Sequence, residues 1–89
     1  MKKSVILSIQ GKVQGVGFRY FLKQKADLLQ ISGFAKNRPD GTVYVEAEGD
    51  AEQLELFINF CQKGPSYAWV EKTEFQWCPL QNFNGFNIK

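Results

Sequence analysis

The chain has 89 residues, a hydrophobic content of 44% and a formal net charge of +2. This length predicts a single domain spanning residues 1–89, large enough to bury one hydrophobic core. The small charge excludes a polybasic surface for nucleic acid or anionic lipid. The apolar run near the start ends by Gln10, before a signal peptide's stretch of about 7–15 apolar residues is complete. We therefore expect a cytoplasmic protein without a membrane segment.

The sequence contains no histidine and only two cysteines, Cys61 and Cys78. Without an imidazole, Ser-His and Cys-His nucleophile pairs are excluded and a transition-metal site is disfavoured. The two cysteines are too few and too far apart for a metal knuckle or a disulfide scaffold. We expect no metal and no cofactor, so any catalysis has to work without a histidine base.

Periodicity divides the chain into strands and helices. Alternating apolar residues predict strands, whereas apolar residues recurring every three to four positions predict helices. In chain order the predicted elements are a strand at 5–10, a helix at 18–29, strands at 31–38 and 42–48, a helix at 50–63, a strand at 69–78 and a short final strand at 86–88.

Local signals refine the middle of this pattern. Asp40-Gly41 between two strands predicts a hairpin, and the alternation that follows directs Glu48 outward from the sheet. Asp50 is a suitable N-cap for the second helix, with Gln53 as its capping-box partner. The expected core face of this helix comprises Leu54, Phe57, Ile58 and Cys61.

The order β-α-β-β-α-β predicts an α+β, ferredoxin-like, two-layer fold with two helices on one face of an antiparallel sheet. Right-handed crossovers place the first and third strands next to each other in the interior of the sheet. The first and second strands then end at the same edge, so residues 11–19 and Asn37 are expected to lie close together.

Three glycines fall within residues 11–17, directly before the first helix. Such a run can curl its N–H groups toward one point, and the helix N-terminus adds partial positive charge. Arg19 would lie beside this cradle with a planar set of donors suited to phosphate. A dinucleotide fingerprint does not fit, because Tyr20 replaces its third glycine, and no Walker sequence closes the loop. On the backbone pattern alone, a phosphate site and a simple tight turn remain open alternatives.

Two segments together resemble the acylphosphatase family. Residues 11–19 (GKVQGVGFR) match its first signature, and residues 33–43 (GFAKNRPDGTV), with Gly49 after them, match its second. The resemblance covers the whole chain, and two long motifs at the correct spacing are specific. It implies hydrolysis of a carboxyl–phosphate bond to a carboxylate and inorganic phosphate. Trp69 is a departure, because the family usually carries arginine there.

The resemblance also implies residue roles. Arg19 would bind the phosphoryl group, and Asn37 would hold the attacking water. The phosphate-binding main chain would comprise Gln14, Gly15, Val16, Gly17 and Phe18. The implied partners are a small-molecule acyl phosphate and inorganic phosphate as product and inhibitor. We expect a monomer that binds neither nucleic acid nor membrane.

Other interpretations of these residues and of the fold are possible. Arg19 could pair with a surface carboxylate, and Asn37 could be a turn residue. A ferredoxin-like domain can bind RNA on its open sheet face, but Glu46 and Glu48 on that face would repel a phosphate backbone. A third possibility is a non-catalytic acylphosphatase-like regulatory or binding domain. The free-standing length favours the enzyme.

Overall fold

The computed structural model describes residues 1–89. Its elements are β1 (Lys2–Lys12), α1 (Phe18–Leu29), β2 (Ser32–Asn37), β3 (Val43–Asp50), α2 (Ala51–Lys63), β4 (Trp69–Cys78) and β5 (Phe86–Ile88). This order confirms the predicted sequence of strands and helices, although β1 begins earlier than its apolar alternation indicated. Neither helix is long and apolar enough to cross a membrane.

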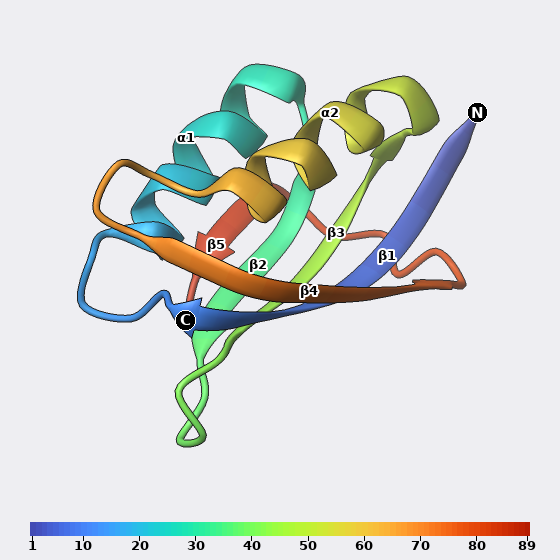
Figure 1. The fold of residues 1–89 in the computed structure, drawn as a ribbon. Coiled ribbons are helices and arrows are strands. Elements are labelled where there is room, and N and C mark those ends of the chain that lie inside the picture. Colours follow the sequence, from blue (N-terminus) through green and yellow to red (C-terminus); the bar gives the residue numbers. More distant parts are fainter.

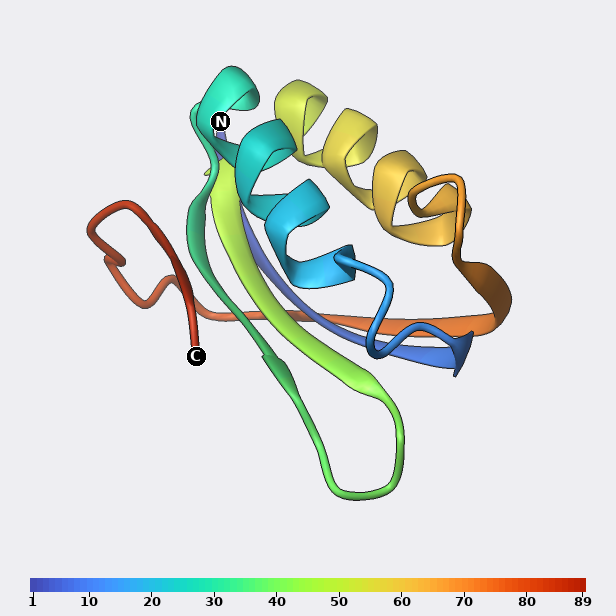
Figure 2. The same cartoon turned by 90° about the vertical axis from the view of Figure 1, so that its left-hand side faces the viewer.

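The five strands form one sheet in the order β4-β1-β3-β2-β5, with both helices on the same face (Figure 1). Figure 2 shows α1 and α2 side by side over this face. The strands β1, β2, β3 and β4 pair in antiparallel fashion, which confirms the ferredoxin-like arrangement with β1 next to β3. The short β5 differs, because it runs parallel to β2 at the edge of the sheet.

The core lies between the sheet and the helices. Every second residue of β1 and β3 faces the helices, and one stripe of each helix faces the sheet. Burying one such apolar side chain contributes about 1.5–3 kcal/mol. The α2 residues predicted for the core are all buried, together with Val5, Leu7, Ile9, Phe18, Leu22, Ala26, Val43, Val45 and Ala47.

Glu48 corrects the expectation of an exposed carboxylate. It faces away from the helices, as the alternation predicted, but only 1% of it is exposed. Because β4 and β5 are opposite edges of the sheet, the chain between them has to cross the open face. On that face the Glu48 carboxylate accepts hydrogen bonds from the main-chain N–H groups of Gln81, Asn82 and Phe83 at 2.6, 3.3 and 3.2 Å. The repulsion argument against RNA binding therefore does not hold for Glu48.

The capping box predicted at the start of α2 was wrong. Asp50 is the N-cap residue, but its side chain forms no capping hydrogen bond. The N–H of Ala51 instead donates to the main-chain oxygen of Met1 at 2.9 Å. The Asp50 carboxylate lies 3.5 Å from the Met1 amino group. Pairing of β1 with β3 brings Met1 to this helix end, so a distant main-chain acceptor replaces the local cap.

Candidate active site

Residues 13–17 connect β1 to α1 and form the loop expected to bind an anion. Gly15 and Gly17 have φ angles of 74° and 75°, in the left-handed region that favours glycine. A Cβ atom at either position would meet nothing within 4 Å. The backbone conformation, rather than lack of space, is therefore the reason for glycine in this loop.

The loop and the first turn of α1 carry a run of free donors. The first main-chain bond of this helix joins the Phe21 N–H to the Gly17 oxygen at 2.9 Å, and no main-chain N–H of residues 15–20 donates within the protein. No side chain caps the helix, and its first turn has no acidic residue. Unpaired N–H groups at the positive end of a helix dipole favour a bound anion.

These donors border a hollow of about 250 Å³. Its lining comes from the β1–α1 loop, the first turn of α1, the end of β2 and the strand β5. The lining residues are Val13, Gly15, Gly17, Phe18, Arg19, Tyr20, Asn37 and Ile88. The predicted meeting of residues 11–19 with Asn37 is thus confirmed, although the two segments are separated by the whole of α1.

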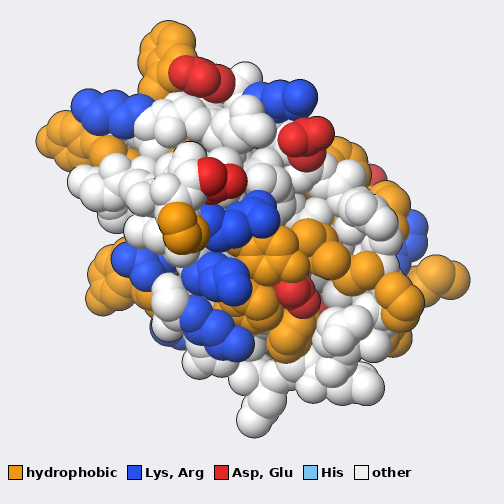
Figure 3. Space-filling model, turned by 90° about the horizontal axis from the view of Figure 1, so that it is seen from below, with side chains coloured by type: hydrophobic (Ala, Val, Ile, Leu, Met, Phe, Trp, Pro, Cys, Tyr) orange, Lys and Arg blue, Asp and Glu red, His pale blue; other side chains and the backbone are white.

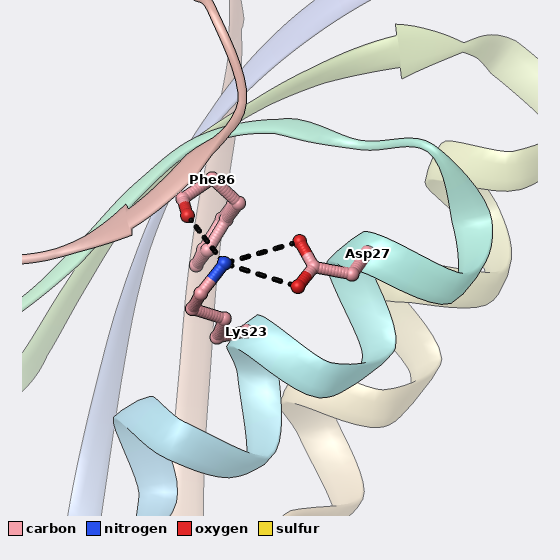
Figure 4. Close-up of polar contacts among 3 residues, drawn as sticks. All are labelled: Lys23, Asp27 and Phe86. Atoms are coloured by element: carbon pink, nitrogen blue, oxygen red, sulfur yellow. Dashed lines mark hydrogen bonds and ion pairs between the residues drawn. The ribbon is translucent and has the colours of Figure 1, made fainter.

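Arg19 lies half-buried in the first turn of α1. Its Nη1 donates to the main-chain oxygen of Lys89 at 2.8 Å, and no carboxylate side chain forms an ion pair with it. One turn later, Lys23 Nζ donates to the Phe86 oxygen at 3.1 Å and to the Asp27 carboxylate at 3.0 and 3.3 Å (Figure 4). Two side chains of α1 therefore attach it to β5 and to the residue after β5, and no acidic side chain pairs with the arginine.

Asn37 is the last residue of β2 and pairs with Val43 of β3. It therefore precedes the hairpin turn instead of forming part of it. The turn itself is held by Asp40, whose Oδ1 accepts from the Thr42 hydroxyl at 2.7 Å and from the Thr42 N–H at 3.0 Å. These bonds, led by the one from the hydroxyl, lower the pKa of the Asp40 carboxyl.

Of the other predicted site residues, Gly15, Gly17 and Phe18 line the hollow, whereas Gln14 and Val16 do not. The side chain of Gln14 leaves the loop toward the β2–β3 hairpin, while Val16 packs against the core. Phe18 is 2% exposed and belongs to the hydrophobic core. The Phe18 ring packs closely on Gly64, because a Cβ atom added at Gly64 would lie 2.7 Å from this ring. Trp69, on β4, is not among the residues that line the hollow.

Sequence reasoning missed three lining residues. Tyr20, which the sequence analysis gave no role in the site, is 66% exposed beside the hollow. Tyr20 lies three residues after Gly17, on the first helical turn, and this spacing could have indicated its place beside the hollow. Val13 is buried under the loop. Ile88 carries no local signal, because β5 joins the site only through its pairing with β2.

The open face of the sheet carries positive charge. Figure 3 shows lysine and arginine side chains gathered beside hydrophobic ones on the underside of the molecule. On this face the Arg38 guanidinium lies 4.5 Å from the centre of the Tyr44 ring, and its Nη2 donates to Ser8 Oγ at 2.9 Å. Lys89 Nζ lies 4.1 Å from the centre of the Phe34 ring. Arg38 thus follows Asn37 in sequence but is held on the other side of the sheet.

The acylphosphatase family model matches residues 5–88 of the chain. The chain belongs to the acylphosphatase family. It is 45% identical over 84 residues to the acylphosphatase of Thermus thermophilus, covering 94% of this chain and 96% of that protein. The crystal structure of the acylphosphatase from Bacillus subtilis superposes with a TM-score of 0.92 at 34% identity, covering 100% of this chain and 99% of that one.

A larger protein also contains a region similar to this acylphosphatase. Full-length HypF in its phosphate- and nucleotide-bound form superposes with a TM-score of 0.89 at 25% identity, covering 100% of this chain and 12% of HypF. By contrast, the acylphosphatases above match this chain over nearly their whole length. The predicted activity is confirmed at the level of the family: this acylphosphatase hydrolyses the carboxyl–phosphate bond of acyl phosphates.

Proposed function

We propose that this acylphosphatase binds the phosphoryl group of a small acyl phosphate in the hollow bordered by residues 15–20. Asn37, on the neighbouring strand end, would hold the attacking water. The observation that carries the proposal is the run of unpaired main-chain N–H groups over residues 15–20 next to Arg19, which pairs with no acidic side chain.

Arg19 and the loop supply fixed positive charge. In phosphoryl transfer, negative charge is spread over the equatorial oxygens of the phosphorus, so donors held in advance lower the barrier without reorganising. The planar guanidinium presents several donors and can bind two oxygens at once. Its bond to Lys89 restrains the side chain near the loop while using only Nη1.

Asn37 acts by orientation and not as a base. A neutral amide has negligible proton affinity at neutral pH, but it can both donate and accept hydrogen bonds to one water. The water oxygen attacks phosphorus, the bond from phosphorus to the carboxylate oxygen breaks, and the water's proton passes to a phosphate oxygen of the substrate. The products are a carboxylate and inorganic phosphate. Because a carboxylate is a good leaving group, the step needs no general acid.

The remaining proposals concern the protein as a whole. The protein would act as a monomer on a small-molecule substrate. Both cysteines are free thiols, which is typical of the reducing cytoplasm. Inorganic phosphate, as product, should occupy the same donors and compete with substrate.

Hydrolysis of benzoyl phosphate tests the proposed site. We expect the wild-type protein to release benzoate and phosphate, and Arg19→Ala to lose this activity while retaining its fold by circular dichroism. An aryl phosphate ester serves as the control substrate, because its poorer leaving group should make it a much weaker substrate. Benzoyl phosphate turnover by Arg19→Ala at the wild-type rate would place the phosphoryl site elsewhere.

A further inference from the structure

The side chain of Gln14 joins the loop before α1 to the hairpin that follows Asn37. Its Nε2 donates to the main-chain oxygens of Arg38 and Thr42 at 2.8 and 2.9 Å. A primary amide has two N–H donors, so both are used on this hairpin.

The two acceptors belong to one closed turn. The Arg38 N–H donates to the Thr42 oxygen at 2.9 Å, and the Gly41 N–H donates to the Arg38 oxygen at 3.1 Å. The Asp40 carboxylate closes the turn further through its bonds to Thr42. Gln14 therefore attaches the loop to a rigid unit that begins one residue after Asn37.

No sheet ladder makes this connection. Pairing between β1 and β3 ends at Ile9 and Val43. The register of β1 shifts between Gln10 and Gly11, and from there to Lys12 the strand pairs only with β4. The loop at residues 13–17 is therefore not paired with the β2–β3 hairpin through the sheet, although the proposed site needs these two segments at a fixed distance. The Gln14 amide supplies the missing hydrogen bonds.

We propose that Gln14 is a positioning residue that sets the distance between the phosphate-binding loop and Asn37. This rests on the proposed function, in which the loop holds phosphorus and Asn37 holds the water. The amide acts through the hairpin: it fixes Arg38 and Thr42, and these fix Asn37 at the end of β2. Displacing a bound water from its line of attack lowers turnover without removing any donor from the phosphate.

The test compares Gln14→Met, which keeps the length of the side chain but removes both donors, with Gln24→Met on the exposed side of α1 as the matched control. We expect Gln14→Met to lower kcat for benzoyl phosphate on the order of a hundredfold. The inhibition constant of inorganic phosphate should change by less than about threefold, because the N–H groups that bind it are intact. Gln24→Met should match the wild type in both quantities.

A double-mutant cycle separates positioning from a merely structural role. In an Asn37→Ala background the water is already lost, so Gln14→Met should lower kcat by no more than about twofold further. An equal loss of kcat in both backgrounds would overturn the proposal, as would a loss of phosphate affinity parallel to that of kcat. Failure of both Gln14→Met and Gln14→Ala to fold would also overturn it, because the bond would then be a stability element.

The outcomes for Gln14 and for the proposed function are distinguishable. If wild-type protein does not hydrolyse benzoyl phosphate, or if Asn37→Ala is fully active, the proposed function fails. If the wild type is active and Asn37→Ala is impaired while Gln14→Met is unaffected, only the role of Gln14 fails.

Discussion

Arg19 on α1 and Lys89 after β5 are joined by a 2.8 Å hydrogen bond from Nη1 to the main-chain oxygen. The partners are 70 positions apart in sequence, and the bond fixes the guanidinium without an acidic side chain. The bond uses only Nη1 of Arg19, so the other guanidinium donors remain available for a phosphate.

Replacing Arg19 with lysine tests whether the planar guanidinium is required. We expect Arg19→Lys to fold but to lose almost all activity, because an ammonium cannot bind two oxygens in fork geometry. The loss of such a contact costs about 2–5 kcal/mol, roughly a 30- to 5000-fold decrease in kcat/KM. Steady-state kinetics with benzoyl phosphate measure this. Circular dichroism checks that the variant is folded, and an Arg19→Lys variant with half the wild-type rate would remove Arg19 from the mechanism.

Asn37 and Arg19 are expected to differ in their effect on phosphate binding. A ligand that binds only the folded state raises the melting temperature by mass action. If Asn37 holds only the water, Asn37→Ala should lose turnover yet still be stabilised by inorganic phosphate, whereas Arg19→Ala should not. Thermal denaturation at rising phosphate and constant ionic strength measures both. Loss of the phosphate shift in Asn37→Ala would assign Asn37 to the anion site.

Neither thiol chemistry nor a metal is expected to contribute. Burial raises the pKa of the Cys61 thiol, so it stays protonated and unreactive at neutral pH. No three His, Cys, Asp or Glu side chains gather into a possible metal site. We expect a chelator to leave activity unchanged and Cys61 to be alkylated only after denaturation, as read by mass spectrometry. Inhibition by a chelator that added metal reverses would contradict the proposed mechanism.

Glu48 is expected to stabilise the crossing between β4 and β5. Glu48→Gln replaces one carboxylate oxygen by an N–H donor, which would face the N–H groups of residues 81–83. Hydrogen bonds to a charged group contribute about 1.5–3 kcal/mol, and we expect a loss of stability of that order. Urea denaturation measures it, with Glu71→Gln on exposed β4 as the control. Equal stability of the two variants would show that the Glu48 bonds contribute nothing.

Alkaline pH is expected to destabilise the protein through Tyr44. Burial, aided by the hydrogen bond to Glu46 at 2.5 Å, raises the pKa of Tyr44 from 10.0 to about 12. The folded state then holds this proton where the unfolded state has released it, so the stabilisation is complete below pH 10.0 and disappears as the pH rises through about 12. Between these pH values, the free energy of unfolding should decrease with pH more steeply for the wild type than for Tyr44→Phe. Urea denaturation at a series of pH values measures it. The same pH dependence of the free energy of unfolding in both proteins would contradict the raised pKa of Tyr44.

The elements and the main parts of the site could be predicted from the sequence because their signals are local. Periodicity located both helices, Asp40-Gly41 located the hairpin, and the glycines before α1 located the loop that borders the hollow. Topology rules then brought Asn37 to that loop. Each of these inferences needs only neighbouring residues or the order of the elements.

The tertiary structure alone decided which distant groups complete the site. Ile88 reaches the hollow because β5 pairs with β2. Glu48 is buried because the chain crosses the sheet between opposite edges. Gln14 joins the loop to the hairpin through main-chain oxygens. Every residue carries such an oxygen, so no side-chain pattern marks the acceptors, and only the folded chain selects the ones within reach.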